Sequence, residues 1–130
     1  MIKDNHTNIP MAPTDRGRWG ETLAAEYVET LGYAVIERNW RHQKFEIDLI
    51  ARLDDHWVFV EVKTRKTGYL ESALEAVALG KQQRIIQAAH QFIRRQKKPQ
   101  KSIRFDILCV EYDATTWRIQ HIPDAFISLP

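Results

Sequence analysis

The residue types that could do chemistry gather in two neighbouring apolar segments, 45–51 and 57–63. The first segment contains Asp48, and the second contains Glu61 and Lys63. Carboxylate oxygens are hard ligands suited to Mg²⁺. A lysine amine can orient an attacking water and offset the charge that develops on a phosphorane. This combination favours a metal-dependent phosphodiesterase site.

An edge-strand salt bridge is the structural alternative for the same residues, with Lys63 neutralising Glu61 or Asp48. An unpaired buried charge is costly, so this alternative is the better account of any one acid taken alone. Two acids and one amine on adjacent strands favour a site instead.

The two segments are expected to form a β-hairpin with a somewhat long turn around Asp54 and Asp55. Alternate side chains of a strand share a face, so Ile47 and Leu49 are expected on one face and Asp48 on the other. The same rule separates the apolar from the ionisable side chains of the second strand: Val58, Val60 and Val62 against Glu61 and Lys63.

A first helix is expected before the hairpin. Residues 16–31 have apolar side chains at helical spacing, with Gly32 as a stop and Thr14 or Asp15 as a cap. Glu21 falls on the apolar stripe of that helix. It is therefore either paired with a cation or part of the site.

Two helices are expected after the hairpin, beyond a loop over 66–69 that would sit beside the active face. A capping box, Ser-Ala-Leu-Glu, predicts a short helix over 72–80, and a longer helix follows over 81–96. Lys81 and Gln82 begin the apolar stripe of the longer helix, so they could reach the charged face of the hairpin. The alternative is that both side chains extend into solvent.

Further strands are expected over 33–38, 103–111 and 117–122. A turn over 39–42 follows the first of them, and the segment 103–111 is apolar enough for a central, buried position. The predicted order is helix, three strands, helix, two strands. It indicates an α/β fold in which helices cover a mixed sheet.

Two polar residues of the segment 103–111 have structural explanations. Asp106 is expected to pair with Arg104 or another basic residue rather than to act in catalysis. Cys109 is the single cysteine, so it cannot form an internal disulfide. It is expected to be a small buried hydrophobe in a reducing compartment.

Charge is unevenly distributed along the 130-residue chain. The formal net charge is only +2, but residues 81–104 contain eight basic residues and no acid. Such a cluster suggests a surface that meets polyanions, although cations at a helix end also complement its dipole. The residues expected to contact nucleic acid are Arg16, Arg18, Lys81, Gln82, Arg84, Arg94, Arg95, Lys97 and Lys98.

The length of the chain fits a single domain, placed at 15–130 and preceded by a flexible leader over 1–14. The leader has no apolar stretch long enough for a signal peptide, and no segment is apolar enough to span a bilayer. A cytoplasmic protein is therefore expected.

Several segments together resemble one known family. RGRWGETLAAEYVETLGY, EIDLIA, VFVEVKTR and RFDIL follow one another as in the YraN-like family, a branch of the PD-(D/E)XK nuclease superfamily that is similar to archaeal Holliday-junction resolvases. The resemblance covers roughly residues 17–126. It implies a restriction-endonuclease-like three-layer core, with a mixed β-sheet flanked by helices.

The resemblance also implies roles for individual residues. Asp48 and Glu61 match the two metal-binding acids, and Lys63 matches the lysine of the E-x-K motif. Glu21 matches the acid that resolvase-like members carry on the first helix, and it would help to bind metal through water or a second ion. Phe45 departs from the family pattern, which has glycine there, and could fill or narrow the cleft.

The implied activity is metal-dependent hydrolysis of DNA phosphodiester bonds, with Mg²⁺ or Mn²⁺ as cofactor. Branched or junction DNA is among the implied substrates, and a homodimer is among the implied assemblies. Two alternatives stay open. A nucleic-acid-binding module without turnover would not need Mg²⁺ and would bind less tightly as salt rises. A structural or adaptor protein would keep Glu61 and Lys63 as an ordinary ion pair.

Overall fold

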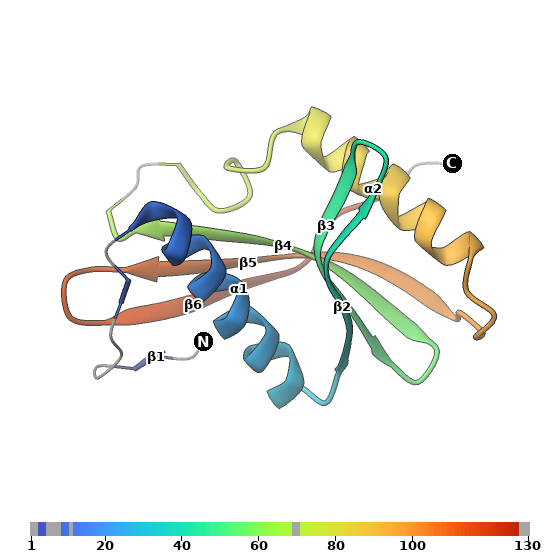
Figure 1. The fold of residues 1–130 in the computed structure, drawn as a ribbon, viewed down its shortest axis with the longest axis horizontal. Coiled ribbons are helices and arrows are strands. Elements are labelled where there is room, and N and C mark those ends of the chain that lie inside the picture. The colour runs from blue at the N-terminus through green and yellow to red at the C-terminus, as the bar shows by residue number, and fades with distance from the viewer. Residues whose placement is uncertain (1–2, 5–8, 11, 69–70, 128–130) are drawn as a thin grey trace.

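A six-stranded sheet between two helices forms the fold, seen in a computed structural model (Figure 1). The structure describes residues 3–4, 9–10, 12–68 and 71–127. In chain order the elements are β1 (Lys3–Asp4), α1 (Pro13–Thr30), β2 (Ala34–His42), β3 (Phe45–Leu53), β4 (His56–Lys66), α2 (Leu79–Arg94), β5 (Ser102–Tyr112) and β6 (Trp117–Phe126). The strands lie in the order β1-β6-β5-β4-β3-β2, and only β4 and β5 are parallel among the described pairs. The predicted α/β fold with a mixed sheet, consistent with a restriction-endonuclease-like core, is confirmed.

Each helix covers one face of the sheet through the apolar stripe that the sequence predicts. α1 buries Ala24, Tyr27 and Val28 against the face that carries Val58 and Val60. On the opposite face, α2 packs against a second cluster of apolar side chains that includes Trp57 and Phe59. The residues that α2 contributes to this cluster are Ile85, Ala88, Ala89 and Phe92. Burying apolar area on both faces is what holds the three layers together.

The crossover between β4 and β5 differs from the prediction at 72–80. The segment forms turns, and Gly80 lies in the first turn of α2 instead of ending a helix. The capping-box contact is present, since the Glu75 N–H donates to Ser72 Oγ at 3.1 Å. A single hydrogen-bonded turn is not enough to nucleate a helix. The backbone of Ala78 is extended, with φ −61° and ψ 153°, so the turns do not run on into α2.

Element boundaries differ from the predictions in three further places. α1 begins at Pro13, after an extended Ala12 that offers no side-chain cap, so neither predicted cap residue is used. β2 runs through the predicted turn at 39–42, and the chain reverses just after it, where Gln43 has φ +56°. The β3–β4 connection is a tight turn, because Leu53 already pairs with His56.

The predicted leader overlaps the folded part of the chain. Lys3 and Asp4 pair with Arg118 and Trp117 of β6, and Arg16 of α1 donates a hydrogen bond to the Pro10 carbonyl oxygen at 3.0 Å. Elements of the fold therefore occur before residue 15, while the division into a flexible leader and a domain stays a prediction. Among the described helices, none combines the length and the apolar character needed to cross a membrane.

Asp106 is structural, as predicted. Arg104 donates two hydrogen bonds to its carboxylate at 2.8 Å, and His121 Nε2 lies 2.7 Å from Oδ2. The Asp124 N–H donates to Oδ1 at 2.9 Å, where the β5–β6 register shifts. Burial alone would raise the pKa of Asp106, but these hydrogen bonds outweigh burial and lower it. Cys109 is a free, fully buried thiol, also as predicted.

Gly20 allows α1 to approach β4 closely. A Cβ atom at this position would overlap Thr64 Oγ1 and would lie 3.1 Å from Thr64 Cβ. Gly17, one turn earlier on the same helix, has no atom within 4 Å of the corresponding position. The small side chain is thus required at one glycine of α1 and not at the other.

We expect Gly20→Ala to lower the free energy of unfolding by about 1–3 kcal/mol, because the added methyl group overpacks the α1–β4 contact. Gly17→Ala is the matched control and should raise it by about 0.5–1 kcal/mol, since alanine favours a helix over glycine. Adding Thr64→Ala to Gly20→Ala should restore part of the loss. Chemical denaturation measures all four proteins, and equal effects of the two glycine substitutions would contradict the contact.

Candidate active site

The site begins where β3 and β4 separate. β3 pairs with β4 from Leu53 only as far as Leu49, which lies opposite Val60. β4 continues beyond this point to Lys66, still paired with β5. In Figure 1 the β2–β3 hairpin turns away from the sheet while β4 and β5 run on together. From Glu61 onward, one edge of β4 is therefore no longer paired with β3.

Asp48 stands at the point of separation, and the side-chain alternation of β3 breaks there. Ile47 packs in the core beside α2, whereas Leu49 packs in the core beside α1. The prediction that these two side chains share a face is therefore wrong. Asp48 Oδ2 accepts a hydrogen bond from the Val62 N–H at 2.8 Å. The carboxylate thus takes a position that a main-chain acceptor would hold in a continuous ladder.

Glu61 lies on the opposite face of β4 from Val58, Val60 and Val62, as predicted, and the three valines pack toward α1. Its side chain is 4% exposed, and its Oε1 atom lies 2.7 Å from Lys81 Nζ. Lys81 was predicted either to reach the charged face of the hairpin or to extend into solvent. The contact with Glu61 agrees with the first alternative. The salt-bridge alternative expected Lys63 to neutralise Glu61 or Asp48. In the structure, Glu61 pairs with Lys81 of α2 instead.

All four predicted catalytic residues line one cavity of about 310 Å³, here called the acidic cavity. Glu21 comes from α1, Asp48 from β3, and Glu61 and Lys63 from β4. The remaining lining residues are Pro13, Arg16, Gly17, Val62, Thr64, Lys81 and Tyr112. Within the described part of the chain, Lys63 makes no ion pair, so its amine is available to a bound group.

The two acids at the separation point repel each other. Burial, and then the charge of Glu61, raise the pKa of Asp48 to about 7 from its ordinary 3.8, although the Val62 N–H acts to lower it. Burial is the largest influence on the pKa of Lys81 and acts to lower it, but the hydrogen bond to Glu61 and the charges of Glu61 and Asp48 together outweigh burial and raise it. Lys81 thus pairs with Glu61, while the repulsion between Asp48 and Glu61 remains.

The donor chemistry of the acidic cavity fits a hard divalent cation. Two carboxylates from adjacent strands, completed by water and phosphate oxygens, are a common way for proteins to hold Mg²⁺. Burial and the charge of Glu61 raise the pKa of Asp48, and a bound cation would act in the opposite direction. Among residues 3–4, 9–10, 12–68 and 71–127, no group of three or more acids, histidines or cysteines is placed to hold a metal ion.

The residues predicted to contact nucleic acid divide between the two ends of α2 and the start of α1. Arg16 and Lys81 line the acidic cavity, and Gln82 instead donates to the Val77 carbonyl oxygen at 2.9 Å. Arg94 lies thirteen residues after Lys81, or about 20 Å along the helix. The exposed residues near that far end are Arg94, Arg95, Lys97 and Lys98, and the exposed residues nearer the cavity are Arg18 and Arg84.

Sequence reasoning missed several residues that shape the cavity. Tyr112 lines it from the end of β5, and its hydroxyl accepts a hydrogen bond from Arg16 Nη1 at 2.6 Å. Thr64 meets Gly20, which brings Glu21 to the cavity. A helical glycine one residue before an inward-facing acid was the available signal for this contact.

Phe45 packs against the core beside α2 and is not among the residues that line the cavity.

Comparisons with known proteins agree on one family. A family model described as "Uncharacterised protein family UPF0102" matches residues 20–110. A UPF0102 protein of Nitratidesulfovibrio vulgaris is 39% identical over 110 residues, covering 85% of this chain and 82% of that protein. One from Chlorobium chlorochromatii is 39% identical over 125 residues, covering 92% and 96%. One from Hahella chejuensis is 39% identical over 112 residues, covering 86% and 90%.

We expect Asp48→Asn to raise the melting temperature in metal-free buffer, and to raise it more at pH 8 than at pH 5. An acid whose pKa is raised by folding favours the folded state below its unfolded value of 3.8, and that contribution is lost as the pH rises through about 7. Asparagine keeps an oxygen for the Val62 N–H but carries no charge. Glu46→Gln removes an exposed carboxylate from the same strand and serves as the control. An Asp48→Asn gain that is equal at both pH values would contradict the raised pKa.

Proposed function

Because the chain belongs to the UPF0102 family of YraN proteins, which is PD-(D/E)XK-like, we propose that it is a metal-dependent endonuclease acting on DNA. One observation carries the proposal: Glu21, Asp48, Glu61 and Lys63, from three different elements, line one cavity. An ordinary ion pair would not need a second acid, Asp48, beside Glu61 at the point where two strands separate.

Asp48 and Glu61 would hold the cation, with Glu21 assisting directly or through water. A bound Mg²⁺ or Mn²⁺ would supply charge stabilisation for the phosphate oxygens and an acidified water. Lys63 would orient that water and offset charge on the phosphate. Lys81 already neutralises part of Glu61, which limits the charge that a single dication must balance.

DNA is the proposed partner because the lining of the acidic cavity includes cations as well as acids. Arg16 and Lys63 offer donors to phosphate oxygens beside the proposed metal ligands. The exposed cations at the far end of α2 would contact the backbone of the same substrate, about 20 Å away. Branched DNA, a homodimer and a cytoplasmic location belong to this proposal.

A second candidate is a nucleic-acid-binding module without turnover. The Lys81–Glu61 ion pair of 2.7 Å favours it, because this pair can satisfy Glu61 without any metal. The two candidates differ in their need for a divalent cation. Binding by a silent module would depend on salt and not on Mg²⁺.

We expect wild-type protein to bind Mn²⁺ and Mg²⁺ by calorimetry and then to cleave a four-way DNA junction. Asp48→Asn should lose metal binding and cleavage together. Lys63→Ala should bind metal but cleave at least 100-fold more slowly, as removal of one charged catalytic group usually does. Lys44→Ala, an exposed lysine outside the cavity, is the control for preparation and charge.

Cleavage that persists in Asp48→Asn and Lys63→Ala preparations would overturn the nuclease proposal. Junction binding without metal binding would support the silent module. Light scattering of the same free and DNA-bound samples tests the homodimer.

A further inference from the structure

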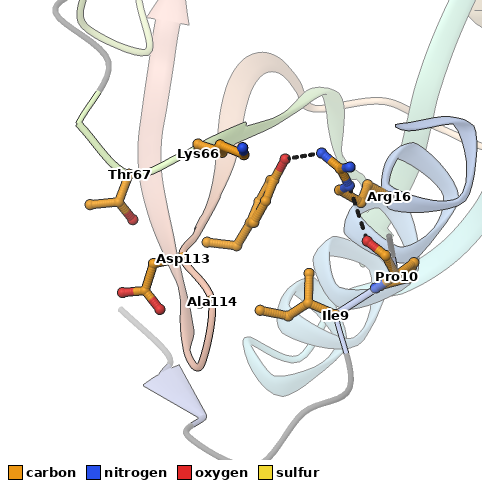
Figure 2. A pocket seen from close by; sticks show the side chains of 8 residues that line it. Ile9, Pro10, Arg16, Lys66, Thr67, Asp113 and Ala114 are labelled. Carbon is orange, nitrogen blue, oxygen red and sulfur yellow. Dashed lines mark hydrogen bonds between the residues drawn. The ribbon is translucent and has the colours of Figure 1, made fainter. Parts of the chain in front are cut away.

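A second pocket, here called the side pocket, lies next to the acidic cavity and has a volume of about 570 Å³ (Figure 2). Ile9, Pro10 and Ala114 give it apolar walls. Lys66 and Thr67, at the end of β4, add an amine and a hydroxyl. Its size is typical of a pocket for a small organic ligand, which ranges over about 300–1,000 Å³.

Arg16 and Tyr112 form a wall common to the side pocket and the acidic cavity. Arg16 Nη1 donates to the Tyr112 hydroxyl at 2.6 Å, and Arg16 Nε donates to the Pro10 carbonyl oxygen at 3.0 Å. The guanidinium also lies 5.4 Å from the centre of the Tyr112 ring. These contacts hold a cation at the boundary, where a phosphate linking the two spaces would lie.

The side pocket has different chemistry at its two ends. Figure 2 shows Thr67 and Asp113 across the pocket from Arg16 and Pro10. Asp113 Oδ1 accepts hydrogen bonds from two backbone N–H groups of the β5–β6 turn, each at 2.9 Å, so its carboxylate is held in place. The cationic end suits a phosphate, and the carboxylate end suits the amino groups of a nucleobase. Apolar walls between them suit the faces of the base.

We infer that the side pocket binds an unpaired nucleotide adjacent to the phosphate that sits in the acidic cavity. This inference rests on the proposed function and narrows its substrate class. A base within a duplex is enclosed by its partner and its stacked neighbours, so it reaches such a pocket only after extrusion. The preferred substrate is therefore DNA with an unpaired nucleotide at the cleavage site, such as a flap or a branch point.

The test uses the full chain in EDTA, so that binding is measured without cleavage. The probes are duplexes with a 5′ or a 3′ single-stranded flap whose first unpaired nucleotide is 2-aminopurine. Fully paired duplexes that contain 2-aminopurine are the reference. Wild-type protein should change the fluorescence of at least one flap probe by twofold or more and leave the paired probes nearly unchanged.

Ala114→Trp fills the side pocket without changing charge. It should abolish the fluorescence change and weaken flap binding about fivefold or more, since the contacts to one base would be lost. Ala34→Trp is the matched control, an exposed alanine at the start of β2, and should behave like wild type. Lys66→Met is a second variant, which should weaken flap binding more than duplex binding.

Wild-type behaviour of Ala114→Trp and Lys66→Met towards both flaps would overturn the inference. So would an equal response of wild-type protein to flap and paired probes. Cleavage in Mg²⁺ is measured separately. If the protein cleaves DNA and its flap preference is unchanged in Ala114→Trp, the nuclease proposal stands and the side-pocket inference fails. If the protein never cleaves DNA but Ala114→Trp loses flap binding, the side-pocket inference stands and the nuclease proposal fails.

Discussion

The end of β3–β4 pairing at Leu49 and Val60 is the constraint on which the site depends. A main-chain ladder that continued to the end of β4 would pair its N–H groups and cover its edge. Instead, the side chain of Asp48 accepts the Val62 N–H, and Glu61 lies buried beside it. Two carboxylates are thereby held close together by backbone geometry. Their mutual repulsion is the cost of a site organised before any ligand arrives.

α1 and α2 complete the cavity by two different kinds of contact. α1 can lie close to β4 because Gly20 has no side chain, and this places the next residue, Glu21, at the cavity. α2 approaches through charge, since Lys81 near its N-terminus meets Glu61. Both contacts are made to β4, the strand shared by the hairpin and the parallel pair. Glu61 and Lys63 lie on β4, Asp48 is hydrogen-bonded to it, and Glu21 follows the glycine that contacts it. Displacing β4 would therefore disturb all four proposed catalytic side chains together.

Sequence alone predicts the parts of this architecture that depend on local periodicity. The apolar stripes of α1 and α2 and the shared face of Val58, Val60 and Val62 follow from spacings of 3.6 and 2 residues. The break at Asp48 could not be predicted, because alternation rules assume a continuous ladder. Nor could the choice of Lys81 over Lys63 as the partner of Glu61. That choice depends on how the crossover from β4 to β5 returns α2 to the sheet.

The acidic cavity and the side pocket draw on different parts of the chain. All four proposed catalytic residues lie within the residues 20–110 that the family model matches. Six of the eight residues that line the side pocket lie outside that range, three before it and three after it. The wall shared by the two spaces joins the two flanks of the matched range, because Arg16 precedes that range and Tyr112 follows it. Hydrolysis would thus depend on the matched part of the fold. Choice of substrate would depend on the two flanks, which contact each other through the Arg16–Tyr112 hydrogen bond beside the proposed position of the phosphate.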